Sequence, residues 1–176
     1  MPVTKRGYDF NELLSALQKD IRRGKEYEAL FWAVELESFN PKALWSYLRV
    51  IASEDIGIAN PFLPLLIETL QRQYNEATKE GYRRLYLAHA VTALVKSEKS
   101  RLAVDLANVV NLEIKNENKK LRIPDYALDR HTLKGKRKGR GWKHFFEVGS
   151  ELVNETKKFP NAYKKRAEEL VSKYEK

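Results

Sequence analysis

Apolar residues recur at helical spacing along most of this chain, and the alternation typical of β-strands is almost absent. In the first such segment Leu13, Leu17 and Ile21 fall on one face, and Asp9 is placed to cap it. Two later segments start with a pair that has the form of an N-cap followed by proline at the first helical position, Asn40-Pro41 and Asn60-Pro61. The pattern therefore predicts an all-α fold.

Six helices are expected within the span Tyr8–Asn116, joined by short turns. They begin close to Asp9, Tyr27, Asn40, Asn60, Leu85 and Ser100. Gly81 is placed to separate the fourth helix from the fifth. The apolar stripes would form one compact core, and the sixth stripe contains Leu102, Leu106 and Val109. Aromatic residues make up 11% of the chain, which is more apolar surface than six short helices bury alone, so an oligomeric interface is also expected.

The composition of the chain changes after Asn116. Four of the eight glycines lie between Gly135 and Gly149, and a last amphipathic segment begins at Phe159-Pro160. We therefore predict three parts. These are a helical core over residues 8–116, a basic glycine-rich extension over residues 117–158 that belongs to the same domain, and a C-terminal helix over residues 159–176.

The most unusual segment is Arg130–Lys143, with the sequence RHTLKGKRKGRGWK. It contains seven Lys and Arg residues and no Asp or Glu, so it carries most of the chain's net charge of +9. Positive charge concentrated in a glycine-rich stretch is typical of a segment that contacts phosphates, and an aromatic residue there could stack on a base. The candidate nucleic-acid-binding residues are Arg130, Lys134, Lys136, Arg137, Lys138, Arg140, Trp142 and Lys143. Two alternatives stay open: pairing with acidic patches of the same chain or of a neighbouring subunit, and a solvated loop that only aids solubility.

Several classes of chemistry find no support in these residues. The stretch GKRKGRG does not match the nucleotide-binding pattern G-x-x-x-x-G-K-[ST], and no Walker-B run of apolar residues ending in paired acids is present. The chain has no cysteine, and the surroundings of His131 and His144 are too basic for a metal cation. We therefore expect no enzymatic activity, no cofactor and no metal. The chain also lacks an apolar stretch of membrane-spanning length and a signal-peptide core, which predicts a cytoplasmic protein without membrane contact.

An acidic pair, Glu54-Asp55, follows the third apolar stripe within ASEDIGIANP. One interpretation makes this pair a metal site or a general base. The other is structural: the helix dipole disfavours acids near a helix C-terminus, so the pair would belong to a turn or be matched by an arginine. We favour the structural interpretation, with Arg22, Arg23 or Arg49 as the counterion.

Four segments, in this order, resemble the C-terminal region of the replication-associated recombination protein A family, also called MgsA. Its members are AAA+ ATPases similar to clamp loaders. The segments are Ser15–Leu36, Ile51–Pro61, Leu87–Arg101 and Ile123–Leu152. The recurring element SEDIG-x-A-x-P corresponds to Ser53, Glu54, Asp55, Ile56, Gly57 and Pro61, and we assign it a structural role. The block around IPDYALDRHT is similar to a branch in which this region occurs without the ATPase.

The resemblance implies an all-α domain related to the clamp-loader collar, homo-oligomerisation with a tetramer as the expected state, and a role in DNA replication or recombination repair. ATP hydrolysis is not carried over, because the nucleotide-binding and lid modules of the family have no counterpart in these residues. The predicted function is a non-catalytic oligomeric module that binds DNA or a DNA-bound partner, and an AAA+ ATPase or another replication or repair protein is a further expected partner. The alternative is a purely structural assembly partner of an AAA+ ATPase, without nucleic-acid contact.

Overall fold

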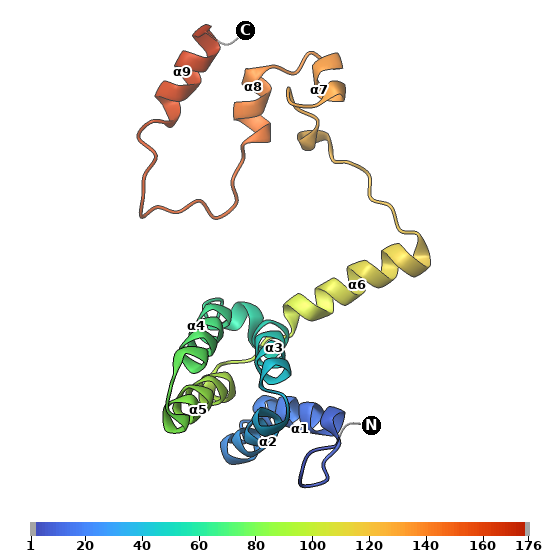
Figure 1. The fold of residues 1–176 in the computed structure, drawn as a ribbon. Coiled ribbons are helices and arrows are strands. Elements are labelled where there is room, and N and C mark those ends of the chain that lie inside the picture. The colour runs from blue at the N-terminus through green and yellow to red at the C-terminus, as the bar shows by residue number, and fades with distance from the viewer. Residues whose placement is uncertain (1–2, 175–176) are drawn as a thin grey trace. The chain divides into compact units, whose positions relative to one another are not determined.

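The structure is a computed structural model that describes residues 3–174 (Figure 1). Every regular element in this part of the chain is helical, which confirms the all-α prediction. The extended backbone pairs at one isolated β-bridge, between Val3 and Asp9. None of the helices in the described range is both long and apolar enough to cross a membrane.

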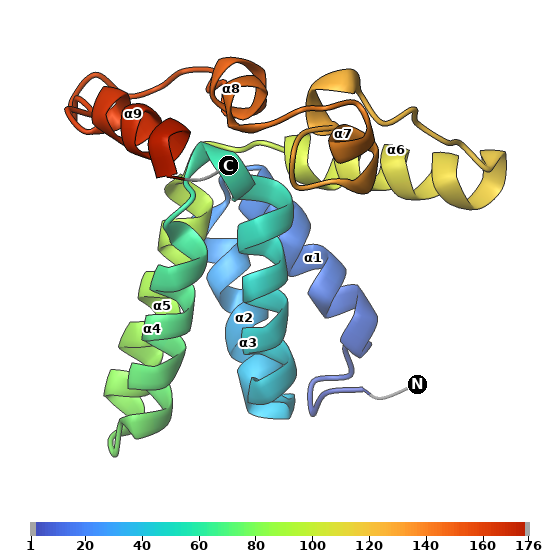
Figure 2. The same ribbon diagram turned by 90° about the horizontal axis from the view of Figure 1, so that it is seen from above.

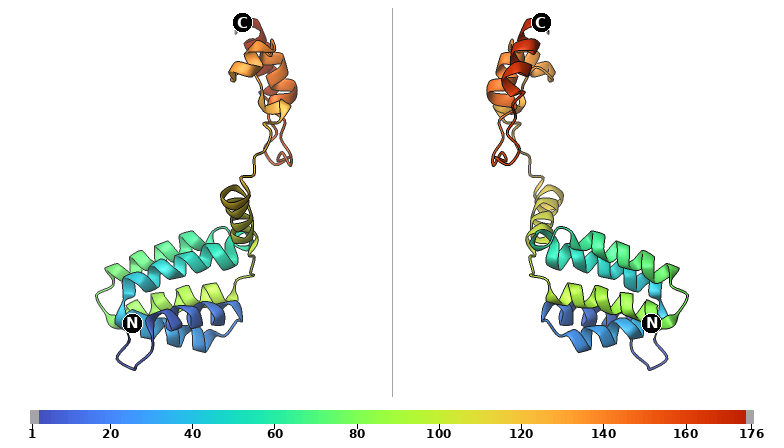
Figure 3. Two further views of the ribbon diagram at one scale, coloured as in Figure 1. Left: turned by 90° about the vertical axis from the view of Figure 1, so that its right-hand side faces the viewer. Right: turned by 90° about the vertical axis from the view of Figure 1, so that its left-hand side faces the viewer.

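Five helices form a bundle in the first part of the chain. They are α1 (Phe10–Arg22), α2 (Glu26–Phe39), α3 (Pro41–Ile51), α4 (Leu63–Glu76) and α5 (Glu80–Lys96). Their long axes run in roughly the same direction in Figures 2 and 3, where α1 lies beside α2 and α4 lies beside α5. The core comes from one apolar stripe of each helix and includes Leu13, Leu17, Ile21, Ala29, Ala33, Leu36, Leu44, Trp45, Leu48, Ile67, Leu70, Leu87, Ala90 and Leu94.

Two of the predicted helix starts are made by side-chain caps. The carboxylate of Asp9 accepts hydrogen bonds from the backbone N–H groups of Asn11 and Glu12 at the start of α1. The side chain of Asn40 accepts one from Ala43 N at 3.0 Å, with Pro41 in the first turn of α3. Each cap satisfies N–H groups that have no partner within the helix.

The starts of α4 and α5 differ from the prediction. Helix α4 begins at Leu63 instead of directly after Asn60, because Asn60 closes a turn in which its carbonyl accepts a bond from Leu63 N at 3.1 Å. Pro64 then takes the early proline position of α4. Gly81 lies inside the first turn of α5, which begins at Glu80, so Gly81 does not separate two helices.

Helix α6 (Leu102–Glu117) contacts the π-helical turn η1 (Ala52–Ile56) and the 3-10 turn η2 (Gly57–Ala59), and none of its own residues is buried. Large apolar side chains are exposed along it, namely Leu102, Leu106, Val109, Val110, Leu112 and Ile114. Part of this set was expected in the core. It stays exposed because the core closes around the stripes of α1–α5 without it.

The chain divides after Asn118 into two compact units, Met1–Asn118 and Lys119–Lys176. We call them the first unit and the C-terminal unit. The C-terminal unit contains η3 (Asp125–Ala127), α7 (Leu133–Arg137), α8 (Trp142–His144), the π-helical turn η4 (Phe145–Gly149) and α9 (Lys164–Tyr174). Helix α9 begins at Lys164, later than the predicted start at Phe159-Pro160, because Asn161 forms a turn in which its side chain accepts a bond from Tyr163 N.

Candidate nucleic-acid interface and the Asp55 network

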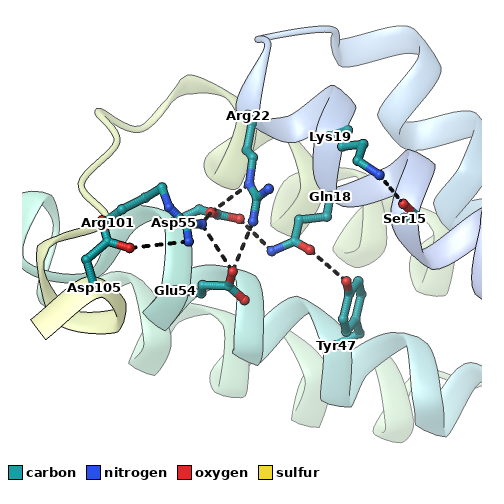
Figure 4. A network of polar contacts seen from close by, with 9 residues as sticks. All are labelled: Ser15, Gln18, Lys19, Arg22, Tyr47, Glu54, Asp55, Arg101 and Asp105. Atoms are coloured by element: carbon teal, nitrogen blue, oxygen red, sulfur yellow. Dashed lines mark hydrogen bonds and ion pairs between the residues drawn. The ribbon is translucent and has the colours of Figure 1, made fainter. Parts of the chain in front are cut away.

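A buried carboxylate, that of Asp55, is the centre of a polar network in the first unit (Figure 4). Only 1% of Asp55 is exposed. Its Oδ1 accepts a hydrogen bond from Arg22 Nε at 2.7 Å and lies 3.2 Å from Arg101 Nη1, and its Oδ2 accepts one from Gln18 Nε2 at 2.8 Å. A buried charge is tolerated only when it is paired and hydrogen-bonded, and Asp55 meets both conditions.

Neighbouring side chains extend this network on two sides. Glu54 accepts bonds from Arg22 at 3.0 Å and from Arg101 at 3.1 Å. On the other side, the Tyr47 hydroxyl donates to Gln18 Oε1 at 2.7 Å. The pKa of Tyr47 is raised, chiefly because its hydroxyl is partly buried and further because the negative charge of Glu54 is close. The network therefore joins α1, α3, η1 and the start of α6.

The turn η1 orients Asp55 toward this network. Asp55 and Ile56 are adjacent in this π-helical turn, and both are buried. The carbonyl of Asp55 accepts a bond from Ser100 N at 2.9 Å, which fixes the segment before α6. Gly57 follows with φ +45°, in the left-handed region that favours glycine.

Both carboxylates of the acidic pair are matched by arginine side chains. Arg22 and Arg101 each pair with Glu54 and with Asp55, and their positive charge opposes the binding of a metal cation. Among residues 3–174 there is no group of three or more His, Cys, Asp or Glu side chains able to hold a metal ion. Of the remaining residues of the SEDIG-x-A-x-P element, Ser53 and Pro61 are exposed.

Sequence reasoning found part of this network and missed the rest. Of the three arginines considered, Arg22 is the counterion, whereas Arg23 donates to Lys19 O and Arg49 to Gln71. Arg101 was missed because it lies far along the chain, and Gln18 was missed because it carries no charge. The spacing of four residues between Gln18 and Arg22 was a usable signal, since it places both on one face of α1.

The basic segment Arg130–Lys143 folds into turns within the C-terminal unit. Thr132 caps the short helix α7 by accepting a hydrogen bond from Gly135 N at 3.0 Å. Gly135 is buried against the carbonyls of Leu128 and Asp129, where a Cβ atom would clash with backbone. A glycine is needed here for close approach of two backbone segments.

Two of the predicted contact residues are matched by an acid. Lys138 Nζ lies 2.7 Å from Asp125 Oδ1, and Arg140 pairs with Asp125 Oδ2. Arg140 also donates to the carbonyl of Asp125 at 2.7 Å and to that of Leu128 at 2.8 Å. The hydrogen bonds from Lys138 and then Arg140 lower the pKa of Asp125 to about 2. These two cations therefore hold the turn together.

Four other cations of the segment have no acidic partner within residues 3–174, namely Arg130, Lys134, Lys136 and Arg137. We call these four residues the unmatched cations. Lys143 has only a weak acidic partner, because its Nζ lies 4.0 Å from Glu147 Oε1 in an exposed pair. The segment thus keeps a positive surface after its internal pairs are formed.

Trp142 is packed among other rings in this unit. The guanidinium of Arg130 lies 3.6 Å from the centre of the Trp142 ring, and the Phe146 ring is nearly parallel to it at 5.7 Å. His131 and Phe145 contact Trp142 edge-on. A nucleic-acid base would therefore stack on Trp142 only after displacing one of these neighbours. Arg130, in contrast, is held in a fixed place by the cation–π contact.

Comparison of the sequence with known proteins identifies the family to which this chain belongs. Residues 26–173 match the family described as MgsA AAA+ ATPase C terminal. The replication-associated recombination protein A of Coxiella burnetii (strain RSA 493 / Nine Mile phase I) is 30% identical over 131 residues, which make up 73% of this chain and 29% of that protein. The protein of the same name from Bacillus subtilis (strain 168) is 32% identical over 132 residues, or 74% of this chain and 31% of the relative. The matched region thus spans less than a third of either relative, and by its match over residues 26–173 this chain belongs to the MgsA AAA+ ATPase C-terminal family.

Proposed function

We propose that this protein is a non-catalytic, self-associating module of DNA replication or recombination repair that acts in the cytoplasm and contacts DNA through its C-terminal unit. The observation that carries the DNA contact is the set of unmatched cations, Arg130, Lys134, Lys136 and Arg137. The names of the relatives supply the link to replication and recombination.

Charge arithmetic supports the DNA contact. Lys and Arg side chains that neutralise phosphates release counterions, so affinity falls with salt by a log–log slope of about 0.7 to 0.9 for each phosphate. Cations already paired with Asp125 gain little from a phosphate, because they would have to exchange one anion for another. The unmatched cations make no such exchange, so they are the residues that we assign to DNA.

Self-association is supported by the exposed apolar side chains of α6. Leu106 is 59% exposed and Val110 is 42% exposed in the single chain, and Leu106 lies on the stripe that was expected to be buried. Several exposed large apolar side chains on one helix are typical of a protein–protein interface. We assign a second copy of this chain as the occupant, because a two-fold interface uses the same face on both subunits and leaves no apolar surface unpaired.

The DNA contact is tested by replacing all four unmatched cations with alanine. Binding of a labelled forked DNA, measured by fluorescence anisotropy at several salt concentrations, should weaken strongly, and the slope of log affinity against log salt should fall by about 3. The matched control replaces four exposed cations of the first unit, Lys5, Lys42, Arg72 and Lys79, and removes the same charge. Equal loss in both variants would contradict the assignment of the contact to the unmatched cations. No binding by the original protein at moderate salt would favour the structural alternative without nucleic-acid contact.

Self-association is tested by light scattering on the purified protein. Leu106→Glu with Val110→Glu should give a monomer that keeps the helical content of the original protein, because both side chains are exposed in the single chain. Asn108→Glu with Asn111→Glu adds the same charge on the other side of α6 and should keep the oligomer. A monomeric original protein would refute a second copy as the occupant and would leave an AAA+ ATPase as the candidate partner.

A further inference from the structure

A cavity of about 620 Å³ opens within the C-terminal unit and is lined largely by cations. Arg130, Lys136, Arg140 and Lys143 contribute to its wall, and Trp142 and Ser172 also line it. None of the residues that line it in the described part of the chain is acidic. Ser172 comes from α9, so two segments that are separate in the sequence, the basic segment and α9, meet around one positively charged space.

Two of these cations are held in place before any ligand arrives. Arg130 lies over the Trp142 ring at 3.6 Å. Arg140 is fixed by Asp125 and by the carbonyl of Leu128 at 2.8 Å, and only 16% of its side chain is exposed. A guanidinium that is fixed in advance loses less side-chain entropy when it binds an anion. The two lysines are exposed and can adjust to what enters.

The charges around the cavity do not balance within the described chain. Asp125 compensates Arg140, whereas Arg130 and Lys136 have no acidic partner among residues 3–174. Lys143 has only the exposed contact at 4.0 Å to Glu147. The cavity therefore presents two to three positive charges that lack a close counterion, and it is lined in addition by Ser172, whose hydroxyl can donate a hydrogen bond.

We propose that this cavity binds a phosphomonoester group, and specifically the terminal phosphate of a nucleic-acid strand. An internal phosphodiester carries one negative charge, whereas a phosphomonoester carries about 1.5 to 2 near neutral pH. Two to three uncompensated cations around one cavity match the second value better. The planar guanidinium of Arg130 can also bond two phosphate oxygens at once.

This inference deepens the proposed function and rests on it for the source of the phosphate. It divides the unmatched cations into two groups with different tasks. Arg130 and Lys136 line the cavity, whereas Lys134 and Arg137 do not. Lys134 and Arg137 would follow the internal phosphates of a strand, and the cavity would select its end.

The test compares one short oligonucleotide with a 5′-phosphate, a 3′-phosphate or hydroxyl groups at both ends, together with inorganic phosphate. Affinities come from fluorescence anisotropy, and binding to the cavity is followed by NMR of the Trp142 indole N–H and the Arg130 side-chain N–H in the full chain. We expect at least one phosphorylated end to bind about tenfold tighter than the hydroxyl form, and inorganic phosphate to shift both NMR signals.

Two variants separate the cavity from general charge. Lys136→Ala with Lys143→Ala should abolish the preference for the phosphorylated end, and both residues are exposed, so the fold is kept. Lys134→Ala with Arg137→Ala removes the same charge outside the cavity and should weaken all oligonucleotides equally while keeping the preference.

The possible outcomes separate this inference from the proposed function. Equal affinity for phosphorylated and hydroxyl ends, with no NMR shift on adding inorganic phosphate, would overturn the phosphate cavity and leave the DNA contact standing. Shifts caused by inorganic phosphate and lost in the Lys136→Ala, Lys143→Ala variant, without any binding of DNA, would support a phosphate site and overturn nucleic acid as its source.

Discussion

Asp55, in the turn after α3, lies 3.2 Å from Arg101, which directly precedes α6. Forty-six positions separate the two residues, and yet the carboxylate is almost completely buried while the guanidinium is partly exposed. The pair connects the five-helix bundle to the helix that carries the exposed apolar side chains. Asp55 of the SEDIG-x-A-x-P element thus links η1 to the residue directly before α6.

Replacing Asp55 with asparagine should destabilise the first unit by about 2 to 4 kcal/mol, because two guanidinium groups lose a buried counterion. Glu54→Gln is the matched control, and since 27% of the Glu54 side chain is exposed, its cost should stay below about 1 kcal/mol. Urea unfolding followed by circular dichroism measures both. Similar costs for the two variants would contradict the central position of Asp55.

Gly57→Ala should cost about 1 to 2 kcal/mol in the same assay, because alanine is strained at φ +45°. Gly81→Ala serves as the control, since Gly81 lies in the first turn of α5 with nothing within 4 Å of a Cβ atom. It should stabilise the protein by about 0.5 to 1 kcal/mol. If both substitutions changed the free energy of unfolding in the same direction, the role of backbone conformation at Gly57 would be refuted.

Gly135→Ala should loosen the C-terminal unit and leave the first unit intact. A Cβ atom at this position clashes with the backbone of Leu128 and Asp129, and forcing it in should cost about 1 to 3 kcal/mol. Hydrogen exchange measured by mass spectrometry should show faster exchange across residues 125–145 and no change in α1–α5. Unchanged exchange in both units would show that the turn has room for a methyl group.

The pairs of Asp125 with Lys138 and Arg140 should make the C-terminal unit sensitive to acid. Because the folded-state pKa of Asp125 is lowered from 3.8 to about 2, the carboxylate stabilises the folded unit above pH 3.8. That contribution is lost as the pH falls from about 4 to about 2. Carboxyl-carbon NMR should follow the titration of Asp125 directly, and Lys138→Ala should move its pKa back toward 3.8. A titration at the ordinary value in the original protein would show that these pairs do not form in solution.

Tyr74 should be the last tyrosine to ionise. Burial, followed by the hydrogen bond to Glu37 at 2.9 Å, raises its pKa to about 12. Because the folded state favours the neutral hydroxyl, this contribution to stability is complete below pH 10 and is lost as the pH rises toward 12. When tyrosinate absorbance is followed against pH, the step at the highest pH should disappear in Tyr74→Phe. The same step should remain in Tyr82→Phe, since Tyr82 is 53% exposed.

Local patterns predicted most helices of this protein but not every boundary. The starts of α1 and α3 follow from Asp9 and Asn40, because a cap depends on residues two or three positions away. The start of α4 did not follow from Asn60, since that residue is engaged in a turn after Gly57. The turn depends on the π-helical segment η1, which has no comparable local signature.

In the basic segment, too, the sequence predicted some features and not others. Its composition predicted a positive surface, and four of its cations have no acidic partner within the described chain. Composition could not show that Arg140 and Lys138 pair with Asp125, because that acid lies outside the segment. Nor could it show that Arg130 rests on Trp142.

The sequence by itself determined the helical class, the main caps and the place where positive charge gathers, because periodicity, capping and net charge depend on residues close together in the chain. Only the tertiary structure decided which charges are matched, which apolar stripe stays exposed and which cations share a cavity. These outcomes depend on residues far apart in the sequence, such as Asp55 paired with Arg101 or Lys136 and Ser172 lining one cavity, which come together only after the chain has folded.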